Sequence, residues 1–377
     1  MTTSRLHGFL EGTRVLDLSR HLPGPLATLL LADMGAEVTK IESPGGDEMR
    51  SIGPTGPNGR SLFFDAISAG KRSIRLDLKS EAGKAELRRL AASADVLVES
   101  FRPGVMARLG LGADALRATH PGLVYVAMSG YGQDGPLRNA AGHDANYLAR
   151  NGTLSASGTA RQLGYIHPPM ADCTASMFAV SSVLGALLAR GRDGLGCAID
   201  LALADVMMPF QLFALAELGF NGRSPGAETE FLNGGWACYR PYRLGDGRSV
   251  ALGAIEPRFW DAFCRASERL EWLPRHAEPL PQRPLIDELD AHFAAMSVAE
   301  CEARYATADC CLALVLDLDQ ATQSDYMQER GLVRRHPTMR IWEAGYPVCV
   351  DGLRPELRSP LIEEGADSPR QCDRPPF

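Results

Sequence analysis

Residues 14–41, RVLDLSRHLPGPLATLLLADMGAEVTKI, are the stretch that decides the fold. They hold two short β-branched or apolar runs, Arg14 to Leu18 and Glu37 to Ile41, and each run is short enough for a strand. Between the two runs, the Pro23-Gly24-Pro25 turn can start a helix and Gly35 can stop it. The order strand, helix, strand is typical of a parallel sheet with crossover helices.

The same alternation continues through the first 130 residues and predicts an α/β region. Further strand-like runs are Ser73 to Leu78, Val96 to Glu99 and Leu123 to Met128. Farther along, the stretch from Ala171 to Arg190 is apolar nearly all round, which predicts a buried helix beginning close to Asp172.

The length of 377 residues predicts two domains. Turn-rich sequence at residues 221–230 and 330–337 marks the boundaries. We therefore expect a large α/β domain over residues 1–222, a smaller α+β domain over 223–330, and a C-terminal segment, 331–377, that returns to the large domain and has an extended or loose tail from Pro369. Within the smaller domain, Trp236 to Gly253 predicts a hairpin, and the sequence LIDELDAHFAAM predicts a helix.

Composition excludes several classes of protein. A net charge of −7 and a pI near 5.7 argue against a nucleic-acid binder. We find no leader sequence and no apolar stretch approaching the length of a membrane span, so we expect a cytoplasmic protein that does not contact a membrane. The nine cysteines include no C-x-x-C pair, which predicts reduced core thiols and no metal site.

The segment from Gly130 to Gly135, GYGQDG, fits the pattern G-x-G-x-x-G directly after a predicted strand. Pro136 follows the third glycine and the strand comes late in the order, so a dinucleotide site is disfavoured. Two interpretations remain open: a turn whose backbone approaches a ligand, or a plain tight turn.

Three side chains are candidates for chemistry, and each has a structural alternative. His143, in GHDANY, is either a catalytic imidazole or part of a helix start capped by Asp144 or Asn146. Asp172 is either a carboxylate in a water-poor setting near amide donors or an ordinary helix cap. Glu256, in GAIEP, either faces a cleft or caps a helix.

Together these segments resemble the family III CoA-transferase and racemase superfamily (CaiB/BaiF), most closely its α-methylacyl-CoA racemase branch. The resemblance runs through Pro23-Gly24-Pro25 with LLADMGAEVTKIE, Gly70-Lys71-Arg72-Ser73 with LDLK, ESFRPG with LGLG, GYGQDGP, GHDANY and GAIEP. Two departures are Ser43, where the family often carries arginine, and the C-terminal tail.

The resemblance implies a large Rossmann-like domain, a smaller α+β domain and an interlocked homodimer. It implies that His143, Asp172 and Glu256 form the catalytic set, with Glu256 of one subunit beside His143 of the other. An acyl-CoA substrate is expected and no further cofactor. Its CoA moiety would contact a set of basic and turn residues: Lys71, Arg72, Arg102, Gly130, Tyr131 and Gly132.

The activity implied is racemisation of 2-methylacyl-CoA thioesters through an enolate, which requires two opposed acid–base groups. Amides at the start of the helix near Asp172 are expected to stabilise the enolate oxygen. The alternative is a CoA-transferase in which Asp172 attacks the thioester and forms an anhydride. His143 and the P-G-P turn, where transferases of the formyl-CoA kind carry glutamine, favour the racemase. A CoA-thioester binding protein without turnover is the third possibility.

Overall fold

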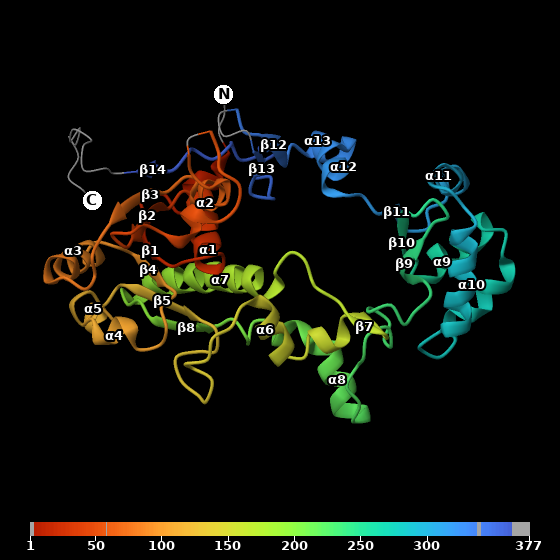
Figure 1. The fold of residues 1–377 in the computed structure, drawn as a ribbon, viewed down its shortest axis with the longest axis horizontal. Helices are drawn as coiled ribbons and strands as arrows, with labels where there is room; N and C mark the ends of the chain where they lie inside the picture. The colour runs from red at the N-terminus through yellow and green to blue at the C-terminus, as the bar shows by residue number, and fades with distance from the viewer. Residues whose placement is uncertain (1–3, 58, 338–340, 364–377) are drawn as a thin grey trace. The chain divides into compact units, whose positions relative to one another are not determined.

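The computed structural model describes residues 4–57, 59–337 and 341–363, and the chain divides into two compact units (Figure 1). The first unit holds residues 1–147, 168–207 and 325–377, and the second holds 148–167 and 208–324. The second unit therefore takes in residues 148–167 and 208–222, which we had expected in the large domain.

A seven-stranded parallel sheet forms the centre of the first unit. The spatial order is β14-β3-β2-β1-β4-β5-β8, and every neighbouring pair is parallel. All five strands predicted from the first 130 residues are present. The bounds are β1 Arg14–Leu18, β2 Glu37–Glu42, β3 Arg72–Arg75, β4 Val96–Glu99, β5 Val124–Ser129, β8 Ala198–Ala202 and β14 Ile362–Glu363.

Helices cover both faces of this sheet. On one face, Leu16, Leu18 and Leu97 of the strands share a core with Leu87 and Leu116. These last two belong to α3 and α5, and α4 contributes to the same layer. On the other face lie α1 and α7, which pack against each other. The bounds are α1 Pro23–Asp33, α3 Glu81–Ala91, α4 Val105–Arg108, α5 Ala113–Thr119 and α7 Met170–Asp193.

Helix α1 begins and ends where the sequence predicts. Pro23 occupies its first turn, where a missing amide hydrogen is not needed. Just beyond its end, Gly35 has a φ of +100°, and a Cβ there would lie 1.7 Å from the carbonyl oxygen of His7. Only glycine fits at that position, which fixes the turn into β2.

Helix α7 differs from the expectation in two ways. It begins at Met170, so Asp172 lies in its first turn and is not the cap. By length and composition alone it is also able to cross a membrane, contrary to our expectation, as the core helix of a soluble protein can be. Within this chain it is only partly covered, since Met177 is 54% and Leu188 is 73% exposed.

The second unit contains the predicted hairpin and helix. Strands β9 (Tyr239–Arg243) and β10 (Ser249–Gly253) pair antiparallel, and β11 (Leu312–Leu314) extends their sheet. An aromatic core, in which Phe263 stacks on Trp272 and Phe293, holds the helices to it. The helices of this core are α9 Pro257–Ala266, α10 Arg283–Ala294 and α11 Val298–Tyr305.

Shorter elements complete the two units. They are α2 Leu62–Ser68, α6 Asp144–Arg150, α8 Leu212–Asn221, α12 Leu318–Gln323, α13 Asp325–Arg330, β6 Gly158–Thr159, β7 Gln162–Leu163, β12 Val333–Arg335 and β13 Trp342–Ala344. Among the described cysteines, Cys311 and Cys349 are exposed, so the prediction of core thiols is wrong for these two. The tail from Pro369 lies outside the described residues.

Candidate active site

The loop after β1 and the start of α6 meet beside the first turn of α7. The rings of His21 and His143 approach edge to face, with centroids 6.3 Å apart. On the α7 side, the Ser176 hydroxyl donates to the carbonyl oxygen of Pro23 over 2.7 Å. In this way the fold gathers His143, Asp172 and the Pro23-Gly24-Pro25 turn, which are far apart in the sequence.

His143 belongs to a capped helix start, as one interpretation predicted, and its catalytic role stays a prediction. It immediately precedes α6, and its backbone amide donates to Asn146 Oδ1 over 3.0 Å, as at a capped helix start. Its side chain is nevertheless exposed, which leaves the imidazole accessible to a substrate.

Asp144 caps α7, a role that sequence reasoning missed. Its Oδ1 accepts hydrogen bonds from the amides of Ala171 (2.7 Å) and Asp172 (3.1 Å), which lie 27 and 28 residues away. Pro169, the cap residue of α7 itself, makes no side-chain cap. These two amides are therefore already engaged, so neither is free to donate to an enolate oxygen. The only signal in the sequence was an acidic residue directly after His143.

Asp172 is half-buried, and its surroundings raise the pKa of its carboxyl. Burial raises the pKa of its carboxyl to about 6, and the nearby Asp144 carboxylate adds to this effect. The proximity of His143 lowers the same pKa in part. A carboxyl with this pKa can both release and accept a proton near neutral pH.

Tyr147 accounts for the close approaches around the glycine-rich turn. Its hydroxyl donates to the carbonyl oxygen of Gly142 over 2.5 Å, and its ring meets Tyr131 edge to face. A Cβ on Gly130 would lie 2.9 Å from the Tyr147 hydroxyl oxygen, and one on Gly142 would lie 2.7 Å from its ring. Gly132 has a φ of +85°, as a turn requires. The tight-turn interpretation therefore explains Gly130 and Gly132, and the predicted CoA contact is not needed for either.

The prediction that Lys71 binds CoA is wrong. Lys71 is 1% exposed, and its ammonium donates to Asp17 (3.0 Å), Thr28 Oγ1 (2.8 Å) and the carbonyl oxygen of Pro25 (2.8 Å). Burial lowers the pKa of Lys71 to about 8, although Asp17 acts in the opposite direction. Lys71 thus joins β1 to the first turns of α1 and cannot reach a phosphate.

The other predicted basic residues lie at different ends of their strands. Arg72 is exposed at the amino end of β3, whereas Arg102 is exposed just after the carboxyl end of β4. Arg20, which the sequence reasoning passed over, follows β1 and lies over the ring of Phe101, 5.4 Å from its centroid. Ligands of open α/β sheets bind at the carboxyl edge. Arg20 and Arg102 are among the cations placed there, as is Arg75 at the end of β3, whereas Arg72 is not.

Glu256 lies in the second unit and occupies the cap position of α9. Its side chain makes no capping hydrogen bond, and Pro257 supplies the first helical residue. The carboxylate contributes to the raised pKa of the Cys311 thiol, after burial and Asp309. The helix-cap interpretation is therefore correct in position only, and the catalytic role of Glu256 stays a prediction.

Comparison with known proteins places this arrangement in one family. Human alpha-methylacyl-CoA racemase is 32% identical over 331 residues, covering 85% of this chain and 81% of that protein. Mouse succinyl-CoA:glutarate CoA-transferase is 33% identical over 297 residues, covering 76% and 67%. The crystal structure of a CAIB/BAIF family protein from Brucella suis superposes with a TM-score of 0.81 at 27% identity, covering 94% of this chain and 96% of that one.

The sequence profile of CoA-transferase family III matches residues 10–366, nearly the whole chain. Its members among the relatives include both racemases and CoA-transferases. The chain belongs to CoA-transferase family III.

Proposed function

We propose that this protein racemises 2-methylacyl-CoA thioesters by moving the α-proton through an enolate. The observation that carries the proposal is the pairing of Asp172, whose pKa is raised to about 6, with the exposed imidazole of His143. The Asp172 carboxyl can accept a proton near neutral pH and return it, and histidine is the side chain most often used for acid–base catalysis. Inversion needs one group to remove the proton from one face and the other to deliver a proton to the opposite face.

A CoA-transferase reaction is the second candidate, because relatives of both kinds match at similar identity. In that reaction the Asp172 carboxylate attacks the thioester carbonyl, CoA leaves as the thiolate, and an enzyme-bound anhydride forms. The neighbouring His143 favours the racemase, since an anhydride mechanism does not need a second acid–base group. A thioester-binding protein without turnover would have no use for a carboxyl of raised pKa beside an imidazole.

We further propose that the active form is an interlocked homodimer in the cytoplasm. No residue of α8 is buried, and Phe213, Leu215 and Phe220 are all exposed, the last at 90%. Exposed apolar helices of this kind indicate a protein contact. In the dimer, Glu256 of the partner subunit would orient His143, as a carboxylate orients the histidine of a hydrolytic triad.

CoA is the only cofactor-like group in this proposal. Its phosphates would meet Arg20 and Arg102 at the carboxyl edge of the sheet, since guanidinium groups pair well with phosphate oxygens. Arg20 also lies 3.4 Å from Glu48, so this ion pair would have to open for Arg20 to bind a phosphate.

The test follows the α-proton of a 2-methylacyl-CoA by NMR in deuterated water. Exchange without any added carboxylate supports the racemase, whereas CoA transfer only in the presence of a second carboxylate refutes it. His143→Ala should retain CoA binding and lower exchange by roughly 10²–10⁴-fold. The matched control, His7→Ala, removes an exposed histidine that is distant from His143 in the sequence. This variant should exchange the α-proton at the wild-type rate.

A further inference from the structure

His21 lies in the loop between β1 and α1, and its ring packs against the imidazole of His143. The two ring centroids are 6.3 Å apart and the ring planes meet at 81°, which is the edge-to-face geometry that aromatic pairs prefer. Within the described part of the chain the exposed His143 imidazole makes no hydrogen bond, and an exposed side chain without a partner moves among several rotamers. The contact with His21 therefore limits the directions in which the His143 imidazole can point.

His21 has a backbone conformation that side chains rarely adopt. Its φ is +62°, in the left-handed region, where the Cβ comes close to the following carbonyl oxygen. Glycine would occupy this position without that clash. Strained residues persist where the surrounding structure fixes them, and they cluster at functional sites. A histidine at a position suited to glycine therefore points to a use for its side chain.

Hydrogen bonds hold the loop on both sides of His21. Before it, the carbonyl oxygen of Ser19 accepts from the ammonium of Lys40 over 3.1 Å, and both residues are buried. After it, the carbonyl oxygen of Pro23 accepts from the Ser176 hydroxyl of α7 over 2.7 Å. The loop is thus tied to the sheet and to the helix that carries the candidate carboxyl.

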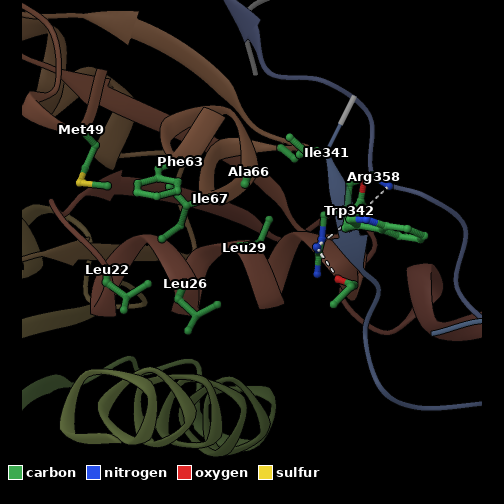
Figure 2. A pocket seen from close by; sticks show the side chains of 13 residues that line it. Leu22, Leu26, Leu29, Met49, Phe63, Ala66, Ile67, Ile341, Trp342 and Arg358 are labelled. Carbon is green, nitrogen blue, oxygen red and sulfur yellow. Dashed lines mark hydrogen bonds and ion pairs between the residues drawn. The ribbon is translucent and has the colours of Figure 1, made fainter. Parts of the chain in front are cut away.

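Leu22, the residue after His21, is held on its apolar side. Its carbonyl oxygen accepts from the amide of Leu26 over 2.8 Å, and the two side chains line the same apolar groove. Figure 2 shows both leucines on one side of this groove and Phe63 of α2 on the other. Anchored residues therefore flank His21 in both directions, and its ring stays against His143.

We propose that His21 is a positioning residue, which holds the His143 imidazole in the orientation needed for proton transfer with Asp172. The inference rests on the proposed function and adds a residue to the site of that reaction. His21 lies in the same unit as both groups, and Asp172 lies close enough to His143 for the imidazole to influence its carboxyl. Packing against His21 would fix the plane of the ring, whereas Glu256 of the partner subunit would fix its tautomer.

The test compares His21→Gly, His21→Asn and His21→Phe in the whole protein. Glycine and asparagine tolerate a left-handed φ, so the first two variants should fold at least as stably as the wild type. Without the ring, we expect kcat for α-proton exchange of 2-methylbutanoyl-CoA to fall about threefold to tenfold and KM to change less than about twofold, as loss of one edge-to-face contact predicts. His21→Phe keeps a ring and loses the nitrogen that lies 3.9 Å from Glu48, so it should retain most of kcat.

Glu268→Gly is the matched control, because Glu268 also has a positive φ, of +57°, and is exposed in the second unit. Relief of backbone strain alone should raise the stability of this variant and leave kcat unchanged. Urea unfolding of every variant separates a loss of folded protein from a loss of kcat. Unchanged kcat in both His21→Gly and His21→Asn would overturn the inference, and so would an equal loss in a fully folded His21→Phe.

A second measurement does not depend on turnover. The ring of His21 shifts the NMR signals of the His143 ring protons, and comparison with His143→Ala identifies those signals. They should move in His21→Gly and His21→Asn and stay displaced in His21→Phe, and signals that do not move in the first two variants would also overturn the inference. A wild-type protein that exchanges no α-proton would count against the proposed function, while these signals still report whether His21 holds His143.

Discussion

At the scale of single residues, neighbours decide what each ionisable group can do. Asp144 and Asp172 are the same residue type, yet one caps a helix and the other is a carboxyl with a raised pKa. Asp144 accepts two amide hydrogen bonds, whereas Asp172 is half-buried, and both burial and the nearby Asp144 raise its pKa. The arrangement separates a structural carboxylate from the carboxyl that we propose as the proton-transfer group.

Asp172→Asn should abolish proton exchange and yet stabilise the fold at alkaline pH. The folded-state pKa of about 6 lies above the ordinary value of 3.8, so folding disfavours the ionised carboxyl. The free-energy cost of holding the ionised carboxyl in the folded protein is complete above about pH 6 and vanishes below about pH 4. After discounting for partial exposure, we expect a gain of about 1 kcal/mol at pH 8 and none at pH 4. Urea unfolding at the two pH values measures this, and equal gains at both would contradict the assignment.

Asp144→Asn should lower the pKa of Asp172, whose backbone amide donates to Asp144. Removing the neighbouring negative charge lowers the pKa of Asp172, so the acidic limb of the exchange profile should move to lower pH. Losing a charged cap should also cost about 1 kcal/mol of stability. Exchange rates from pH 4 to 8 would show the shift. Asn146→Ala, which removes the amide partner of His143 but no charge, serves as the control and should leave the limb in place.

At the scale of elements, a buried ion pair joins β1, β3 and α1. Burial acts to raise the pKa of Asp17, but Lys71, Lys40 and two hydroxyl groups lower it overall. Lys40 in turn bonds Asp47 at 2.8 Å with both groups buried. These contacts fix the start of α1, and with it the turn that faces His143.

Lys71→Met and Arg102→Ala should therefore have opposite consequences. Lys71→Met leaves Asp17 buried without its ammonium partner and should lower the free energy of unfolding by about 3 kcal/mol. Arg102→Ala, at an exposed site, should change stability by less than about 0.5 kcal/mol and weaken CoA binding. Denaturant unfolding measures the stability of each variant, and a CoA titration measures its affinity for CoA. Weakened CoA binding by a fully stable Lys71→Met protein would restore the role first predicted for it.

At the scale of the whole molecule, the exposed apolar surface of α8 predicts assembly. Leu215→Glu places a charge among Phe213, Leu218 and their neighbours, and should dissociate the homodimer and lower proton exchange with it. Sedimentation velocity across a range of concentrations measures the change in mass. Ala85→Glu, an exposed charge on α3, should leave both mass and activity unchanged. A monomeric wild-type protein with full activity would contradict the proposed assembly.

By itself, the sequence determined the strands of the first 130 residues, the hairpin of the second unit and the helix that carries Asp172. Apolar runs and turn residues are local signals, and they predicted β1, α1 and β2 to within one residue. The segments GHDANY and GAIEP also indicated candidate catalytic residues, although the pairing of Glu256 with His143 stays a prediction.

Only the tertiary structure decided what those residues do. The cap that Asp144 provides for α7 joins positions 27 residues apart, and the bond from Lys71 to Asp17 joins positions 54 apart. Periodicity shows which face of an element is apolar, but it does not show which distant partner covers that face. A lysine that looked like a phosphate ligand is therefore a core ion pair. Likewise Asp172, one of whose interpretations was a helix cap, lies in the first turn of α7, and the capping hydrogen bonds go to Asp144 instead.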